Sequence, residues 1–423
     1  MSLFKLLPLA FSSLKNRAGT VILTLITIAL SVTLFLAVEK IRDGTRASFE
    51  ATISGTDLIV GARSAPVNLL LASVFRIGDP PANIKWETAQ AVAARADVAW
   101  TVPLSLGDSH RGERVLGTTA DYFERYKYAD RRGLEFAAGE GFDDLFDVVL
   151  GAETARRLGY VIGSEIELTH GLGEEGISDH EHHEFHVTGI LKPTGTPVDR
   201  TVHVSLEAIS AIHVGWESGA RGHLATEITD EELRELDHTP EGLSALMVGL
   251  TNRASILRTK RAIDTYEDEA LLAVLPGQAL GQLWTMTGFA ERSLRAISAF
   301  VILVGLVSAL ASLLSGLNAR RREMAILRSV GARPWHIGGL LVLEAFIMGF
   351  VGALIGCVLV YAGLAIAGPI LTDRLGIVLN GVGPGLLDVL VIATVSGLAA
   401  LMGLVPALMA YRNTLSDGLN VKL

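Results

Sequence analysis

The stretch that decides the fold reads NARRREMAILRSVGARPWHI, residues 318–337, and it separates two long apolar segments. On a helical wheel Glu323, Ile326, Leu327 and Val330 share one narrow face, with arginines opposite. Gly331 stands where a left-handed residue ends a helix, and proline at 334 is well placed to begin the next one. The stretch therefore predicts a short amphipathic helix between two membrane spans.

Charge places this helix on one side of the membrane. Five arginines crowd the segment: Arg320, Arg321, Arg322, Arg328 and Arg333. Short loops rich in Lys and Arg stay in the cytoplasm, so the segment is predicted to lie there. Two interpretations are open: the arginines only orient the chain and touch lipid head groups, or the helix docks on a cytoplasmic partner. Orientation requires no apolar face, which favours docking.

Composition implies two environments. Half of the 423 residues are hydrophobic and the mean hydropathy is +0.42, yet 19% are charged. Between positions 39 and 292 there are 24 Lys and Arg against 40 Asp and Glu, whereas the rest of the chain is basic. An acidic domain disfavours nucleic acid as a partner. The single cysteine, Cys357, lies in an apolar segment, which favours a packing role.

Hydropathy divides the chain into membrane and aqueous segments. An interfacial helix at 1–17 precedes a first span at 18–38, which is retained as an anchor. A large α+β domain with a helical stalk at each end is predicted at 39–292. The remaining segments are a span at 296–317, the cytoplasmic loop at 318–336, a span at 337–367, a short outer loop at 368–385, a span at 386–409 and a tail at 410–423.

Periodicity within the large domain predicts short elements of both kinds. Strands are expected at 58–60, 98–106, 148–150, 165–169, 185–191, 201–204 and 245–250. Helices are expected at 86–95, 119–126, 152–158, 206–212 and 256–268. In the third span, Gly349, Gly352, Gly356 and Gly363 form a small-residue stripe that permits close helix approach. Packing within the chain and a seam between two copies both fit this stripe.

Several blocks resemble a known family. The motif RRREMAILRSVGA resembles the segment between the second and third transmembrane helices of FtsX/MacB-type ABC transporter permeases. LGTTADYFERY, GLEFAAGEGFDD, VVLGAETARRLGYVIGSEIEL and FHVTGILKPTGTPVDRTVHVSL resemble, in order, the extracytoplasmic domain of MacB-like permeases. The tail PALMAYRNTLSDGL resembles the family's ending, except that Thr414-Leu415 replaces the usual proline.

The resemblance implies a function and a topology. It implies a homodimeric permease subunit in the bacterial inner membrane, with both termini cytoplasmic, the large domain outside and a separate ATPase as partner. Its activity would be mechanotransmission for export or extraction of lipoprotein, peptide or small molecule, with a periplasmic adaptor or lipoprotein as a further partner. FtsX-like regulation of cell-wall hydrolases is an alternative. The residues expected to couple to the ATPase are Arg321, Arg322, Glu323, Ile326, Leu327, Arg328, Val330 and Gly331.

Motifs for chemistry within this sequence are few. No G-x-x-x-x-G-K-[ST] motif occurs, so ATP is expected on the partner subunit and no catalytic residue is assigned.

Histidines form one candidate metal site, at His170, His180, His182, His183 and His186. Whether this segment is extended or helical, it would gather imidazole side chains, which are ligands that suit Zn²⁺, Cu²⁺ or Ni²⁺. A solvated hairpin tip is the other interpretation. Zinc binding or sensing is therefore an alternative function.

Overall fold

The chain forms two compact units. The structure is a computed structural model that describes Ser12, Leu14 and residues 17–170, 184–214, 230–319, 329, 331–375 and 383–416. The first unit, here the helical unit, comprises Met1–Gly44, Gly288–Leu371 and Gly381–Leu423. The second, here the outer domain, comprises Thr45–Thr287 and Thr372–Asn380.

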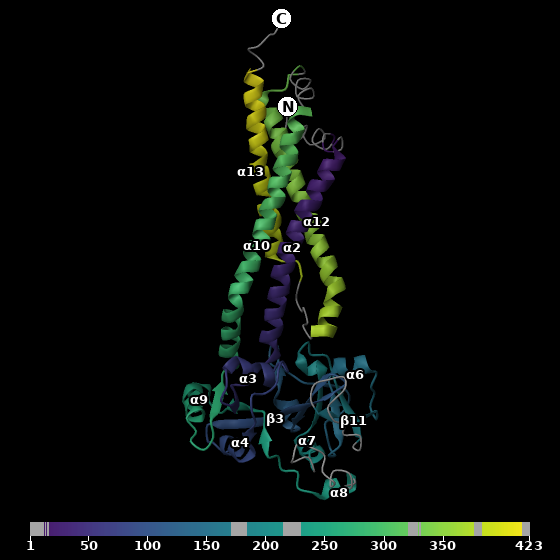
Figure 1. Ribbon diagram of the computed structural model, residues 1–423, viewed down its shortest axis with the longest axis vertical. Helices are drawn as coiled ribbons and strands as arrows, with labels where there is room; N and C mark the ends of the chain where they lie inside the picture. Colours follow the sequence, from purple (N-terminus) through teal and green to yellow (C-terminus); the bar gives the residue numbers. More distant parts are fainter. Residues whose placement is uncertain are drawn as a thin grey trace. The chain divides into compact units, whose positions relative to one another are not determined.

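Four helices of the described chain are long and apolar enough to cross a membrane: α2 (Ala18–Thr52), α10 (Pro276–Ala319), α12 (Pro334–Leu375) and α13 (Leu386–Ser416) (Figure 1). Large apolar side chains on them are exposed, for example Leu23 at 66%, Val358 at 62% and Leu401 at 61%. Such exposure is costly in water and natural in lipid. The predicted four-helix membrane architecture is confirmed.

Glycines allow α12 to approach its neighbours within the helical unit. A Cβ atom added at Gly352 would lie 2.8 Å from Ile28 Cγ2, and one at Gly356 would lie 2.8 Å from the Ala29 carbonyl oxygen, both on α2. At Gly349 the added atom would lie 2.6 Å from Ala399 Cβ of α13. These three glycines therefore serve packing within the chain, whereas Gly363 has nothing within 4 Å.

The outer domain is built on one large mixed sheet. Its order is β15-β1-β14-β3-β4-β12-β8-β11-β7, with β10 paired to β3 and β9 paired to β11. The β4–β12 and β8–β11 pairs are parallel, and the other pairs are antiparallel. The strands are β1 (Leu58–Ala62), β3 (Val98–His110), β4 (Glu113–Thr118), β7 (Phe136–Gly139), β8 (Asp147–Leu150), β9 (Glu165–Ile166), β10 (Thr169–His170), β11 (Phe185–Leu191), β12 (Thr201–Ser205), β14 (Ala245–Leu250) and β15 (Leu271–Val274).

Short helices and two small ladders complete the outer domain. The ladders pair β2 (Ile84–Lys85) with β13 (Gly242–Leu243) and β5 (Lys127–Tyr128) with β6 (Arg132–Gly133). The helices are α3 (Pro66–Ser73), α4 (Trp86–Ala93), α5 (Asp121–Arg125), α6 (Ala152–Leu158), α7 (Leu206–Ile212), α8 (Asp230–Glu235) and α9 (Ile256–Asp264), with 3₁₀ turns at Pro197–Arg200 and Arg253–Ser255. The predicted α+β domain between the first two membrane helices is confirmed.

Local sequence explains several boundaries. β11 alternates between buried and more exposed positions, as expected for a strand with one face in the core. Ser205 begins α7 by accepting a hydrogen bond from the Ala208 N–H, and Gly159 ends α6 with a φ of 74°. Each boundary follows from the residue type at that position.

Two sequence predictions were wrong in detail. The strand expected at 165–169 is two short strands, because β9 pairs with β11 whereas β10 pairs with β3. The helix expected to run to position 268 ends at Asp264, followed by Thr265 in a non-helical conformation. The sequence pattern predicted one strand where strand pairing produces two, and it predicted a longer helix than the backbone at Thr265 allows.

Candidate functional site: the helix lock and the stalk base

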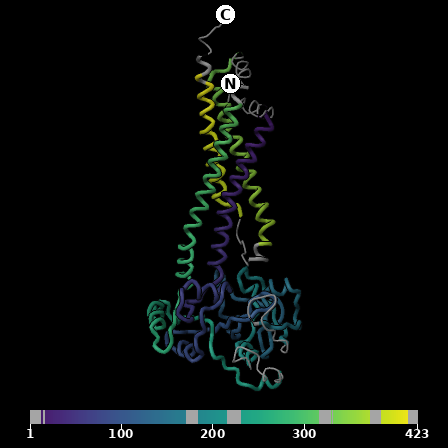
Figure 2. Tube along the Cα trace, viewed as in Figure 1, coloured from purple at the N-terminus to yellow at the C-terminus, as the bar shows by residue number. Residues whose placement is uncertain are grey.

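Two helices continue from apolar segments into the outer domain. α2 runs unbroken from Ala18 to Thr52, and α10 from Pro276 to Ala319, as the purple and green tubes of Figure 2 show. The boundary between the two units falls inside both helices, after Gly44 and before Gly288. Each predicted stalk is thus continuous with a predicted membrane span.

A buried ion pair joins α2 to α13 within the helical unit. Lys40 Nζ lies 2.9 Å from Asp388 Oδ2, and the two side chains are 11% and 8% exposed. Lys40 Nζ also donates to the Gly383 carbonyl at 2.9 Å. The same Asp388 oxygen accepts from the Tyr361 hydroxyl of α12 at 2.9 Å and from the Gly385 N–H at 2.7 Å. One carboxylate therefore connects three helices.

The preceding residue on α2 binds a different helix. Glu39 Oε1 accepts from Arg295 Nε of α10 at 2.7 Å, and Glu39 Oε2 lies 2.8 Å from a nitrogen of Arg42. The Glu39 side chain is buried. Buried charges are tolerated where they are paired and hydrogen-bonded. We call the set Glu39, Lys40, Arg295, Tyr361 and Asp388 the helix lock, because it ties α2 to all three other long helices.

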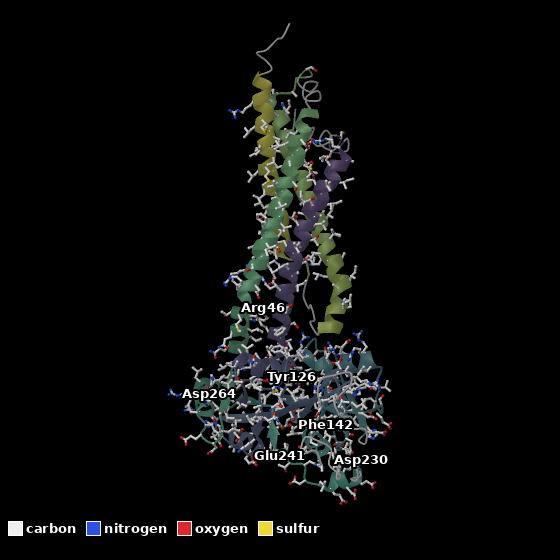
Figure 3. The ribbon with its side chains drawn as sticks, viewed as in Figure 1. Arg46, Tyr126, Phe142, Asp230, Glu241 and Asp264 are labelled. Carbon is white, nitrogen blue, oxygen red and sulfur yellow. The ribbon has the colours of Figure 1, made fainter. Side chains whose placement is uncertain are left out.

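Aromatic rings hold the last turns of α2 in the outer domain. Phe49 stacks on Phe75 with ring centroids 4.4 Å apart, and it meets Trp284 of α10 edge-on at 5.7 Å. The Arg46 guanidinium, labelled in Figure 3, lies 5.1 Å from the centroid of the Trp284 ring. These contacts join α2 and α10 to each other and to the segment that follows α3.

Hydrogen bonds secure the end of α2. The Tyr126 hydroxyl, labelled in Figure 3, donates to the Thr52 carbonyl, and the Ala129 N–H donates to the Ala51 carbonyl at 2.7 Å. The first turn of α10 enters the same hydrophobic core, with Leu280 buried. We call Arg46, Phe49, Thr52, Tyr126 and Trp284 the stalk base. Both stalk helices are therefore anchored in one core of the outer domain.

Buried polar rings in this core are uncharged. Burial raises the pKa of Tyr122 to about 12. Burial, together with the charge of Arg76, lowers the pKa of His203 to about 3. The two rings lie 5.4 Å apart. Because both are neutral at neutral pH, they pack as polar but uncharged core residues.

The predicted coupling residues lie mostly beyond the described chain. Outside it are Arg321, Arg322, Glu323, Ile326, Leu327, Arg328 and Val330. Gly331 has a φ of 93°, the left-handed conformation expected at its position, and α12 begins at Pro334. The left-handed glycine and the helix start at proline that the sequence predicts are therefore both present.

The predicted histidine set is divided among strands. His180, His182 and His183 lie outside the described residues. His170 belongs to β10, which pairs with β3, whereas His186 belongs to β11 and is exposed. Among the side chains that the structure describes, no three of His, Cys, Asp or Glu are grouped to hold a metal ion. His186 is therefore not brought into such a group by the described residues.

Sequence reasoning missed the helix lock. The available signals were Glu39 and Lys40 at the end of one apolar segment and Asp388 inside another. Ionisable residues in apolar helices usually pair with one another, so these positions were candidates for mutual contact.

Comparisons with known proteins match both parts of the chain. The family model of MacB-like periplasmic core domains matches residues 21–266, and that of the FtsX-like permease C-terminal region matches residues 295–416. A macrolide export ATP-binding/permease protein MacB of Wolinella succinogenes is 21% identical over 365 residues, which are 85% of this chain and 53% of that protein. The chain thus spans about half the length of this relative.

Two solved structures match about half of the chain each, at low TM-scores. The periplasmic region of MacB from Actinobacillus actinomycetemcomitans is 10% identical, with 55% of this chain and 94% of that chain covered and a TM-score of 0.33. The extracellular domain of the noncanonic ABC-type transporter YknZ from Gram-positive bacteria is 14% identical, with 52% and 99% covered and a TM-score of 0.30.

Proposed function

Because the chain belongs to the family of FtsX-like permeases with a MacB-like periplasmic core domain, we propose that it transmits movement from an ATPase to its outer domain. As an ABC transporter permease of this type, it is a multi-pass membrane protein with a periplasmic-type domain. The proposal places ATP hydrolysis on a partner outside this chain. Both family matches describe permease parts, and the sequence carries no P-loop motif.

The observation that carries the proposal is the continuity of α2 and α10. Each is a single hydrogen-bonded helix from an apolar segment to the core of the outer domain. Glu39 holds α2 to α10 within the helical unit, and Phe49 and Trp284 hold the same two helices together within the outer domain. A displacement of either helix therefore reaches the outer domain without depending on a flexible linker.

The proposed topology follows the charge pattern. The arginine-rich segment at 318–336 and both termini lie in the cytoplasm of a bacterial cell, the protein sits in the inner membrane, and the outer domain faces the periplasm or cell exterior. The active form is a homodimer with an ATPase pair. The Wolinella relative is named for macrolide export. For this chain we propose export or extraction of a small molecule, peptide or lipoprotein, with a periplasmic adaptor or lipoprotein as a further partner.

The coupling segment supplies the test. The full chain is copurified with the ATPase that it binds, and ATP hydrolysis is compared with and without the permease. Changing Ile326, Leu327 and Val330 all to Asp places three charges on the predicted docking face. We expect the stimulation of ATP hydrolysis to be lost.

A control places two aspartates on the opposite face. Ala325→Asp combined with Ser329→Asp is expected to retain most of the stimulation. Undiminished stimulation by the triple variant, or equal loss in both variants, contradicts docking through the predicted face.

A further inference from the structure

A small pocket in the outer domain gathers basic side chains. Its volume is about 180 Å³. The lining includes residues of β3, α5, the β5–β6 hairpin and the 3₁₀ turn that begins at Arg253, so segments far apart in the sequence meet there. The side chains that bring charge or a ring to the pocket are Trp100, Glu124, Arg125, Lys127, Arg131 and Arg253. Because like charges repel one another, four cations around one small space favour an anion inside it.

Three of these cations have no anionic partner of their own. Within the part of the chain that the structure describes, Arg125, Lys127 and Arg131 form no ion pair. All three residues are exposed, so a solute can reach them. Asp57 offsets the charge of Arg253, and a lining carboxylate, that of Glu124, offsets one further cation. Two positive charges of the pocket are therefore left without compensation.

A buried carboxylate orients the fourth cation. The Asp57 side chain is 9% exposed, and its Oδ1 accepts from Arg253 Nε at 2.9 Å. Its Oδ2 accepts from the Leu250 N–H at 2.9 Å, which fixes the carboxylate to the sheet. Since Nε makes the bond to Asp57, the terminal nitrogens of the Arg253 guanidinium remain available as donors.

Trp100 forms a wall of the pocket that is in place before a ligand enters. It lies opposite Gly249 in the β3–β14 pair, and a Cβ added at Gly249 would overlap the Trp100 ring. The ring therefore covers the glycine backbone, and it also packs against the hydrophobic core of the domain. A wall that is already ordered reduces the entropy that binding has to overcome.

The turn that carries Arg131 has an unusual backbone. The β5–β6 ladder leaves a three-residue loop at 129–131. In this loop Ala129 has a φ of 46° and Arg131 a φ of 61°, left-handed conformations that residues other than glycine rarely adopt. The hairpin is held in place because the Lys127 carbonyl accepts from the Ser54 N–H at 2.8 Å. Strain of this kind persists where the surrounding structure fixes it, and it is concentrated at functional sites.

We propose that this pocket binds a phosphate group, with Arg125, Lys127 and Arg131 as its principal donors. The planar guanidinium fork matches phosphate oxygens, and the lysine ammonium adds a point charge. A phosphate monoester carries a charge of about −1.5 to −2 at neutral pH, which fits two uncompensated positive charges better than a singly charged carboxylate does. The proposal does not depend on coupling to an ATPase.

The test follows tryptophan fluorescence of the purified full chain in a neutral detergent during titration with inorganic phosphate at constant ionic strength. Because Trp100 lines the pocket, binding is expected to change its emission. Trp100→Phe is expected to remove most of this change, which assigns the signal to the pocket. Acetate at the same ionic strength is expected to bind at least tenfold more weakly than phosphate, roughly the effect of one charged hydrogen bond.

Substitutions of the charged residues decide the outcome. Arg125→Gln and Arg131→Gln are each expected to weaken phosphate binding about tenfold, because each removes a charged donor. Arg132→Gln is the matched control: Arg132 is an exposed arginine of the same hairpin that does not line the pocket, and its variant is expected to bind as the unmodified chain does. Glu124→Gln is expected to tighten binding several-fold, because it removes a repelling charge from the lining. A loss of folding could not produce that gain.

Three results overturn the proposal: equal affinity for acetate and phosphate, equal affinity in the variants of Arg125, Arg131 and Arg132, and no bound phosphate when the unmodified chain is examined by equilibrium dialysis. Each would leave the basic side chains as a solvated surface.

Lipid discs distinguish two sources of the phosphate group. The affinity for soluble phosphate is compared in discs of phosphatidylcholine alone and in discs that also contain phosphatidic acid. Weaker apparent affinity with phosphatidic acid identifies a lipid head group as a competing ligand of the pocket. Equal affinity in both discs identifies a water-soluble phosphate compound as the ligand, and both results support a phosphate site.

Discussion

Replacing Lys40 by Met tests the helix lock. The change keeps the length of the side chain but removes its charge, so Asp388 loses the nitrogen at 2.9 Å. Removing one member of a buried ion pair typically costs about 3–5 kcal/mol, because the remaining charge is uncompensated. Asp388 retains the Tyr361 hydroxyl and the Gly385 N–H. We therefore expect the lower end of that range, about 3 kcal/mol.

A double variant distinguishes the loss of the whole ion pair from the cost of leaving one buried charge without its partner. Combining Lys40→Met with Asp388→Leu removes both charges, and the Tyr361 hydroxyl still has the Gly383 carbonyl at 3.0 Å. Apolar replacement of both partners of a buried pair is often close to neutral. We expect the double variant to lie within about 1 kcal/mol of the unmodified chain, which makes it more stable than the single variant.

Thermal unfolding of the purified full chain in detergent measures these differences. A loss of about 3 kcal/mol corresponds to roughly 6–12 °C in the unfolding midpoint. Lys192→Met is the control, because Lys192 pairs with Glu135 at 2.7 Å but both side chains are more than half exposed. Exposed pairs contribute about 0–1 kcal/mol. The reasoning fails if Lys40→Met behaves like Lys192→Met, or if the double variant is the least stable of the set.

Two further predictions concern packing and pH. Gly356→Ala is expected to cost about 1–3 kcal/mol, because the new Cβ would lie 2.8 Å from the Ala29 carbonyl oxygen. Gly363→Ala on the same helix has open space and is expected to be neutral or to stabilise the helix, so equal melting temperatures would contradict the α2–α12 contact. The pKa of His203 in the folded chain is about 3, below its ordinary value near 6.5. Between these two pH values the unfolded chain binds more protons than the folded chain. The folded state therefore loses stability as pH falls from about 6.5 toward 3. At pH 5 this group alone is expected to cost about 2 kcal/mol, and urea unfolding of His203→Gln should show a weaker loss between pH 7 and pH 5.

The membrane helices were predictable because their signal is local. A run of apolar residues long enough to cross a bilayer needs no tertiary partner to be identified. The same applies to α6 and α7, whose ends are marked by Gly159 and Ser205. The amphipathic pattern from Glu323 to Val330 is equally local, although it lies beyond the described residues.

β4 shows why other elements were missed. It is buried along its whole length, yet it begins with Glu113 and Arg114 and does not look apolar. Glu113 is compensated by Arg157 and by Arg200, which are 44 and 87 residues away. A polar start to a buried strand becomes favourable only when those partners fold against it. The same limit hid the contact of His213 with Asp108, since α7 and β3 meet only in the folded sheet.

The two sets of contacts between α2 and α10 use different chemistry, and the difference matches their settings. In the helical unit apolar side chains are already compatible with lipid, so apolar packing alone gives little preference for one helix position over another. The paired charges at Glu39–Arg295 and Lys40–Asp388 define a position because each is costly to separate. In the outer domain water surrounds the core, and the partial burial of Phe49 and Trp284 against each other itself drives association. A helix fixed by charge in one unit and by aromatic packing in the other is held against sliding in both units, as the proposed transmission of movement along it requires.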